Sequence, residues 1–179
     1  MFDALKNAIG ELPFWAEDLG VITPDVEELR DSFGFPGMRI LQFAFGGDAH
    51  NHDLPHNYIN NSVAYTGTHD NDTTVGWFNS GAGKSSTRDD SQIRRERDFC
   101  LKYLATDGKE IHWDFVRAVW SSVANSAVVP MQDLLGLGNE ARINLPGSTM
   151  GNWYWQCREN DFSDEIAERL CGLTEIYGR

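Results

Sequence analysis

The sequence has 179 residues, which is enough for one domain with a sizeable core, and its 41% of hydrophobic residues excludes a disordered chain. Its net charge of −12 argues against nucleic acid and anionic membranes as partners, because both are bound through clustered lysine and arginine. A neutral ligand such as a polysaccharide is compatible with this charge, although an acidic surface also simply keeps a protein soluble.

The cysteines are scattered, odd in number and without a Cys-x-x-Cys pair. They are Cys100, Cys157 and Cys171. This usage predicts free thiols in a reducing compartment. Residues 1–16 lack the basic start and long apolar core of a signal peptide, and no apolar run approaches the roughly 20 residues that a membrane helix needs. We therefore expect a cytoplasmic protein with no membrane partner.

Short apolar runs alternate with polar loops along the first half of the chain. Residues 12–16 predict a first strand. The helix that follows is predicted to begin at Pro24, with Thr23 as its N-cap. Residues 38–45 predict a second strand, and residues 62–65 begin a third.

The second half contains longer helical patterns and one more strand. The predicted helices are 91–104, 113–125 and 161–176. Residues 127–134 predict a fourth strand, and a glycine-rich loop follows over 136–147. The small polar residues of 81–90 predict an exposed loop.

This alternation predicts an α/β fold. Mostly apolar strands followed by helices are typical of a parallel sheet that is covered on both faces. A doubly wound sheet and a (β/α)₈ barrel both fit. Polar residues at the ends of several strands favour the barrel, because barrel enzymes build their active sites there. Four strands make roughly half of such a barrel.

Two carboxylates, Glu17 and Asp70, stand where an apolar run gives way to a loop. Cleavage of a glycosidic bond needs one carboxylic acid to protonate the leaving oxygen, and retaining enzymes place a nucleophilic carboxylate about 5–5.5 Å away. Glu17 suits the acid role, because Phe14 and Trp15 beside it would favour the protonated form. The alternative is a solvated carboxylate at a helix N-terminus. Asp18 is the competing acid, but it is better suited to a structural loop contact.

Asp70 lies within a run of polar residues, between His69 and Asn71, just after the third predicted strand. Such a cluster suits hydrogen bonding to sugar hydroxyls. The alternative is that Asp70 forms an Asx-type turn that caps the next helix.

The histidines and tryptophans carry weaker signals. Three histidines lie in the polar loop 46–61: His50, His52 and His56. Their spacing matches no zinc pattern and no cysteine is near, so we expect no metal site. Trp113 and Trp120 are seven residues apart on a predicted helix, which favours core packing. Trp153 and Trp155 leave core packing and sugar stacking equally open.

Six stretches of the sequence resemble the amylomaltase family of 4-α-glucanotransferases, also called disproportionating enzymes. They are AEDLGVITPDVEELR (16–30), PGMRILQFAF (36–45), LPHNY (54–58), YTGTHDNDTTVGW (65–77), PMQDLLGLGNEARIN (130–144) and GNWYW (151–155). That family is similar to α-amylases in fold and mechanism. It cleaves an α-1,4-glucan, holds the sugar as a covalent intermediate and passes it to another glucan or to glucose. The resemblance implies a (β/α)₈ barrel that acts on maltooligosaccharides, starch or glycogen without a cofactor.

The resemblance also implies roles for five residues. Glu17 matches the general acid/base that follows the fifth barrel strand, and Asp70 matches the transition-state-stabilising aspartate after the seventh. His69 would bind sugar beside Asp70. Phe43 matches an aromatic residue on the donor side, and Asn139 lies in a glycine-rich loop that the family folds over the glucan.

The family's nucleophile has no counterpart here. It is an aspartate in an Arg-x-Asp-His-Phe-like stretch upstream of the acid, and residues 1–16 contain no such stretch. We therefore expect residues 1–179 to be one partial catalytic domain, about strands 5–8 of the barrel, that is inactive alone. The alternatives are an α-amylase-type glucan hydrolase and a non-catalytic glucan-binding module. The family's range makes a plastid the alternative to the cytoplasm.

Overall fold

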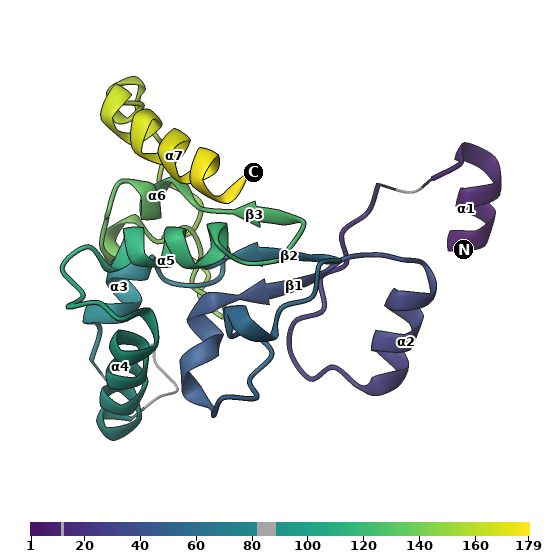
Figure 1. Ribbon diagram of the computed structural model, residues 1–179, viewed down its shortest axis with the longest axis horizontal. Coiled ribbons are helices and arrows are strands. Elements are labelled where there is room, and N and C mark those ends of the chain that lie inside the picture. Colours follow the sequence, from purple (N-terminus) through teal and green to yellow (C-terminus); the bar gives the residue numbers. More distant parts are fainter. Residues whose placement is uncertain (12, 82–88) are drawn as a thin grey trace.

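A three-stranded parallel sheet lies at the centre of the computed structural model (Figure 1). The structure describes residues 1–11, 13–81 and 89–179. The strands lie side by side in the order β1 (Gly37–Ile40), β2 (Ser62–Tyr65) and β3 (Ser126–Val128). Gly37 lies opposite Ser62, and Val63 lies opposite Ser126. The parallel sheet agrees with the sequence-based prediction, and each of these three strands overlaps one of the predicted runs.

Several helices lie toward the carboxyl ends of the strands, whereas the first two lie toward the amino ends (Figure 1). The α-helices of the described residues are α1 (Phe2–Ile9), α2 (Pro24–Ser32), α3 (Thr74–Asn79), α4 (Asp90–Leu104), α5 (Ile111–Trp120), α6 (Met131–Leu134) and α7 (Asp164–Tyr177). Short 3₁₀ helices cover Leu41–Gly46, Pro55–Asn57, Asn139–Ala141 and Glu159–Asp161. Helices α2, α4, α5 and α7 were predicted, whereas α1, α3 and α6 were not. Residues 82–88 of the predicted loop 81–90 lie outside the described residues.

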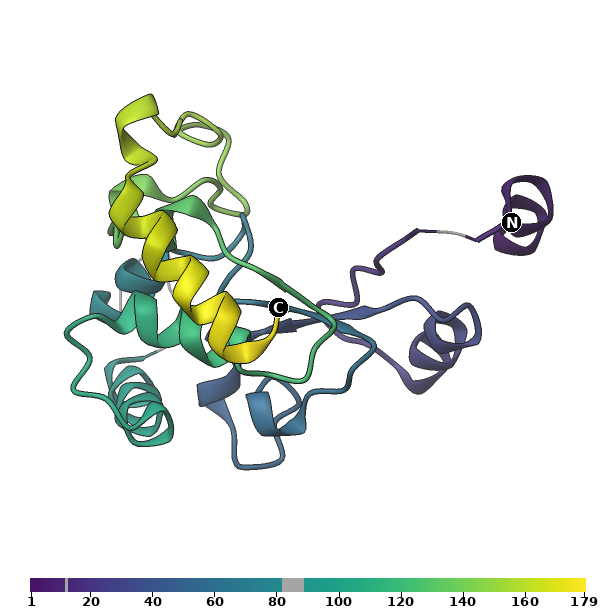
Figure 2. The same ribbon diagram turned by 45° about the horizontal axis from the view of Figure 1, so that its top comes forward.

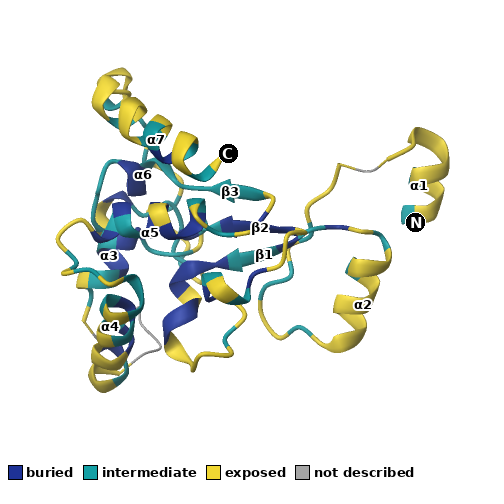
Figure 3. Ribbon diagram, in the orientation of Figure 1, coloured by how far each residue is buried: buried dark blue, intermediate teal, exposed yellow. Residues whose placement is uncertain are grey.

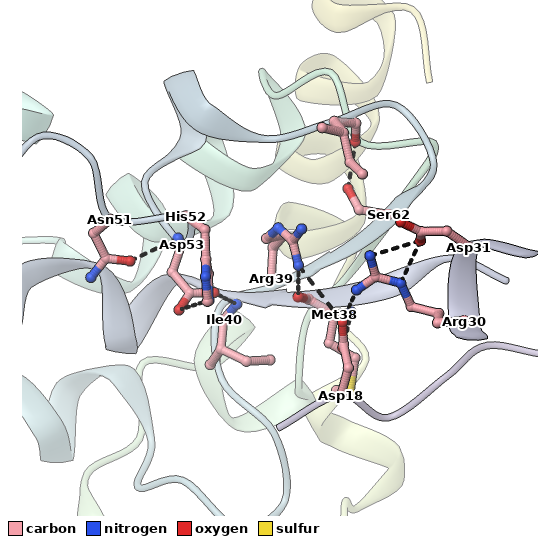
Figure 4. Close-up of polar contacts among 11 residues, drawn as sticks. Asp18, Arg30, Asp31, Met38, Arg39, Ile40, Asn51, His52, Asp53 and Ser62 are labelled. Carbon is pink, nitrogen blue, oxygen red and sulfur yellow. Dashed lines mark hydrogen bonds and ion pairs between the residues drawn. The ribbon is translucent and has the colours of Figure 1, made fainter. Parts of the chain in front are cut away.

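The predicted strand at residues 12–16 is wrong for its described part, because residues 13–16 have no regular structure. A strand beside β1 would bind the outward N–H groups of that edge strand. The carboxylates of Asp18 and Asp53 take them instead, at 2.7 Å from the Met38 nitrogen and 2.8 Å from the Ile40 nitrogen (Figure 4). Side-chain acceptors therefore complete this edge of the sheet.

Two other predicted strands are too long. The 38–45 strand stops at Ile40, and the apolar residues beyond it form the 3₁₀ helix Leu41–Gly46 with its buried side chains facing the core. The 127–134 strand stops at Val128, and α6 begins directly after Pro130. Proline has no N–H to donate to a sheet ladder and is favourable at the start of a helix, which explains this break.

Helix α5 is the centre of the hydrophobic core and packs on both sides. One side buries Phe115 and Val119 with residues of the sheet and of the 3₁₀ helix Leu41–Gly46. The other side buries Trp113 against Leu134 and Leu173, on α6 and α7. Trp113 is 6% exposed and Trp120 packs against both clusters, so the predicted core packing of this pair is confirmed. Figure 3 shows the buried residues gathered around α5, β2 and the residues after β1.

Helices α1 and α2 lie at the opposite end of the molecule from α4 and α5 (Figures 1 and 2). They contribute no buried residue, and both are largely exposed in Figure 3. The ring of Phe2 on α1 packs 5.2 Å from that of Phe33 and 5.1 Å from that of Phe35. Within the part of the chain that the structure describes, no helix combines the length and apolar character needed to cross a membrane.

A buried carboxylate joins three elements beneath the carboxyl end of the sheet. Asp133 on α6 is 1% exposed and accepts hydrogen bonds from the hydroxyl of Thr66, directly after β2, at 2.6 Å, and from the hydroxyl of Thr74, the first residue of α3, at 2.9 Å. The Thr74 N–H donates to it as well, at 2.7 Å. Burial raises the pKa of Asp133, and the hydrogen bonds from both threonines act in the opposite direction. These contacts hold both ends of the 67–73 loop.

Replacing Asp133 by asparagine is expected to destabilise the fold. The amide offers one acceptor oxygen where three donors converge, and its NH₂ group meets a donor, so we expect a loss of about 2–3 kcal/mol in the free energy of unfolding. Thermal melting of Asp133→Asn beside Asp98→Asn, an exposed position on α4, measures this loss. Equal melting temperatures for the two variants would contradict the role given to Asp133.

Candidate active site

A cleft of about 360 Å³ opens at the carboxyl ends of β2 and β3. It is lined by Trp15, Ala16, Glu17, Leu19, Met38, Tyr65, Gly67, Thr68, His69, Asp70, Val128, Val129 and Pro130. The cleft thus brings together Glu17, His69 and Asp70, three of the five residues singled out from the sequence. The two carboxylates Glu17 and Asp70 therefore line the same cleft.

Asp18 anchors the irregular segment that carries Glu17. Its carboxylate accepts the Met38 N–H at the edge of the sheet and forms an ion pair with Arg30 of α2 (Figure 4). A side chain on Gly37 would collide with this carboxylate, so the close approach requires glycine. The Asp18 side chain is only 6% exposed. Asp18 is therefore a structural contact, as the sequence favoured, and it is absent from the cleft lining.

Glu17 is exposed and faces the cleft. It is not at a helix N-terminus, because α2 begins at Pro24 behind Thr23. The alternative is therefore wrong about the helix end, although Glu17 is exposed to solvent as that alternative also held. Burial and the negative charge of Glu17 raise the pKa of Tyr65 at the end of β2. The Tyr65 hydroxyl stays neutral in the cleft and is available as a hydrogen-bond donor.

Other residues take the capping roles considered for Asp70. Thr73 caps α3 by accepting the Gly76 N–H at 3.0 Å. Asn71 closes the turn before it, because its side-chain oxygen accepts from the nitrogen and the hydroxyl of Thr68 at 2.8 and 2.9 Å. The Asx-turn alternative for Asp70 is therefore wrong. The Asp70 side chain is 51% exposed and contributes to the cleft wall.

A distant segment supports Asp70 and His69 from the side. The Asn144 side chain donates to the Asp70 carboxylate at 2.6 Å, and Arg142 donates to the Asp70 carbonyl at 2.7 Å. The His69 Nε2 atom lies 3.3 Å from the same carboxylate. The ring of Trp153 lies 5.1 Å from the His69 ring. The sequence left core packing and sugar stacking as equal alternatives for Trp153. Its side chain is 62% exposed and packs against His69, a residue of the cleft.

Phe43 and Asn139 do not line the cleft. Phe43 lies within the 3₁₀ helix Leu41–Gly46 with 49% of its surface exposed, and Asn139 is exposed at the start of another 3₁₀ helix. Their contact with sugar remains a prediction. Two of the loop histidines have polar side-chain contacts, His52 with Asp53 at 3.1 Å and His56 with the Tyr103 hydroxyl at 3.0 Å. No group of three or more potential metal ligands occurs among the described residues.

Residues 1–161 match the sequence profile of the 4-alpha-glucanotransferase family. The chain belongs to this family. It is 47% identical over 180 residues to the 4-alpha-glucanotransferase of Clostridium butyricum and covers 35% of that protein. It is 45% identical over 183 residues to a 4-alpha-glucanotransferase of Arabidopsis thaliana described as chloroplastic/amyloplastic, and it covers 30% of it. Both alignments include 100% of this chain.

Comparison with a solved structure also shows similarity to an amylomaltase. The amylomaltase from Streptococcus agalactiae in complex with acarbose is similar with a TM-score of 0.86 and 33% sequence identity, over 99% of this chain and 34% of that one. The mixed helices and parallel sheet seen here therefore correspond to a part of an amylomaltase structure. The chain spans about a third of the length of the curated relatives it matches.

Asn144 and Arg142 were not singled out from the sequence, although both lie in a stretch that resembles the family. Their partner Asp70 is more than 70 residues away in the chain. Residue spacing carries no information about a contact between two loops at that separation. Trp153 lies in the GNWYW stretch that resembles the family, so the sequence did draw attention to it. That stretch does not indicate that the Trp153 ring contacts His69.

Proposed function

We propose that this 4-alpha-glucanotransferase family member transfers segments of α-1,4-glucan to another glucan or to glucose. The observation that carries the proposal is the placement of Glu17 and Asp70 on one cleft at the carboxyl ends of parallel strands. Barrel enzymes build their sites at this edge. In this proposal residues 1–179 form one partial catalytic domain, the C-terminal half of a (β/α)₈ barrel with about strands 5–8.

The reaction follows a retaining double displacement. Glu17 protonates the glycosidic oxygen of the leaving glucan, and then removes a proton from the acceptor hydroxyl in the second step. Asp70 stabilises the positive charge that develops on the sugar ring. A retaining mechanism also needs a nucleophilic carboxylate, and Glu17 and Asp70 are the carboxylates among the described residues of the cleft. The nucleophile is therefore proposed to come from outside these 179 residues, and the isolated chain to be inactive.

The substrate would be a maltooligosaccharide, starch or glycogen. Acarbose, the ligand in the Streptococcus agalactiae amylomaltase, is a sugar-like molecule, which supports a glucan in the corresponding cleft here. His69 would bind a sugar hydroxyl, with Phe43 and Asn139 contacting more distant sugar units. The proposed location is the cytoplasm, with the plastid as the alternative that the Arabidopsis relative supports.

The test is incubation of maltotriose with the full-length protein, meaning the complete natural protein that contains these residues. Transfer yields glucose together with a ladder of longer maltooligosaccharides. An α-amylase-type hydrolase yields glucose and maltose without longer products, and a glucan-binding module yields no products. Either of these last two patterns overturns the proposal.

A further inference from the structure

We propose that Asn144 is a positioning residue for Asp70, fixing the orientation of its carboxylate in the cleft. This inference rests on the proposed glucanotransferase function, in which the Asp70 carboxylate faces the sugar ring. It concerns a residue outside the cleft wall, so its effect on the reaction would pass through Asp70.

Asn144 holds the His69–Asp70 dipeptide by both its main chain and its side chain. The Asn144 N–H donates to the His69 carbonyl at 3.1 Å, and its side-chain NH₂ donates to the Asp70 Oδ1 atom at 2.6 Å. Arg142 completes the arrangement, because its guanidinium donates to the carbonyls of Asn144 and Asp70, both at 2.7 Å. Three hydrogen bonds thus join these two short segments, and a fourth, from Arg142 to Asn144, stays within the second segment.

This arrangement separates the two oxygens of the Asp70 carboxylate. Oδ1 is held by Asn144 and lies 3.3 Å from His69. In the described part of the chain, no residue donates a hydrogen bond to Oδ2. One oxygen is therefore fixed by the protein while the other remains available for the sugar. A carboxylate held in advance stabilises developing positive charge without a reorganisation step.

The segment that carries Asn144 is itself well supported. The Asn152 side chain accepts the Leu145 N–H at 3.0 Å, and the Trp153 N–H donates to the Ile143 carbonyl at 2.7 Å. Trp153 has a φ of 63°, which is unfavourable for a bulky residue and persists only where the surroundings impose it. The backbone on both sides of Asn144 is thus fixed, which places its amide reproducibly against Asp70.

The first test compares kcat and KM for maltotriose in the full-length protein and its variants. Asn144→Ala is expected to lower kcat by about 10- to 100-fold with KM changed by less than about threefold, because the lost contact acts on the transition state. Asn160→Ala is the matched control, since Asn160 is an exposed asparagine of the 3₁₀ helix Glu159–Asp161 and does not line the cleft. It is expected to retain the wild-type kcat.

Asn144→Asp adds a readout that a purely structural role would not change. It keeps the side-chain shape but places a second carboxylate beside that of Asp70, and like charges this close disfavour the fully ionised pair. The titratable or charged groups beside Asp70 among the described residues are His69, Arg142 and, across the cleft, Glu17, and the variant retains them. The acid limb of the kcat/KM profile is therefore expected to move to higher pH by about one unit, whereas Asn160→Asp leaves it in place.

The outcomes separate the two proposals. A wild-type protein without transfer activity overturns the proposed function, and the positioning role with it. An active wild-type protein with unchanged kcat in Asn144→Ala overturns the positioning role alone. If Asn144→Ala does not fold, the decision passes to Asn144→Asp, for which an unmoved acid limb has the same meaning. A shift of similar size in Asn160→Asp also contradicts a specific role for Asn144.

Discussion

Glu17→Gln is expected to lower the turnover of maltotriose by the full-length protein by about 10²- to 10⁴-fold, the usual contribution of general acid catalysis. Glutamine keeps the shape of the side chain but has no proton to give to the glycosidic oxygen. Binding should persist, because the amide still forms hydrogen bonds with sugar hydroxyls. Initial rates give the turnover, and calorimetric titration of the slow variant with maltotriose gives the affinity.

The matched control is Glu28→Gln, an exposed glutamate of α2 that does not line the cleft. It undergoes the same chemical change and should keep its turnover. Near-normal turnover in Glu17→Gln would transfer the acid role to another group. The structure makes Asp18 a poor replacement, because its carboxylate is already committed to Met38 and Arg30.

Asp70→Asn is expected to lower turnover by about 10²- to 10³-fold, comparable to the loss of one preorganised electrostatic group in other active sites. The amide retains the size of the carboxylate and an acceptor for Asn144, but it lacks the negative charge that opposes the developing positive charge of the ring. KM should change little, since the ground-state sugar is neutral. Steady-state kinetics on maltotriose separate the two parameters.

Asp98→Asn on α4 serves as the control for this change, because Asp98 is exposed and absent from the cleft. An increase in KM with an unchanged kcat would make Asp70 a ground-state sugar-binding residue. The same result would also remove the basis for the role of Asn144.

Local residue patterns were sufficient to predict the parallel sheet and the strand at 62–65. That run is short, apolar and bounded by polar residues, so only one interpretation fits. The runs at 38–45 and 127–134 were longer, and an apolar run alone does not distinguish a strand from a buried helix. In the second run, Pro130 was a readable signal for the end of the strand. The irregular segment 13–16 was not predictable, since the outward N–H groups of β1 are bound by the carboxylate of Asp18, two residues further on, and by that of Asp53 in a later loop.

The sequence predicted the two carboxylates of the candidate site, but not the residues that contact them from distant loops. Glu17 and Asp70 each follow an apolar run, and the pattern predicted both at the carboxyl edge of a parallel sheet. For Glu17 the cleft was predicted correctly but the strand was not, because residues 13–16 have no regular structure. The sequence could not show that Asn71 closes the turn and that Thr73 caps α3. Only the structure shows that Asp70 takes neither role. Asn144 and Trp153 reach the site by loop folding, which leaves no periodic trace in the sequence.

The anchoring of Asp18 has a consequence for how this site tolerates change. Glu17 directly precedes Asp18, and the two side chains have different surroundings, because Asp18 lies against the edge of the sheet whereas Glu17 lines the cleft. The position of the proposed acid is thus set by its adjacency to the anchored residue. Length changes in the loop between residues 19 and 23 leave that adjacency intact. Insertion of one uncharged residue between Glu17 and Asp18 would move the carboxylate of Glu17 away from its anchor while leaving the net charge unaltered.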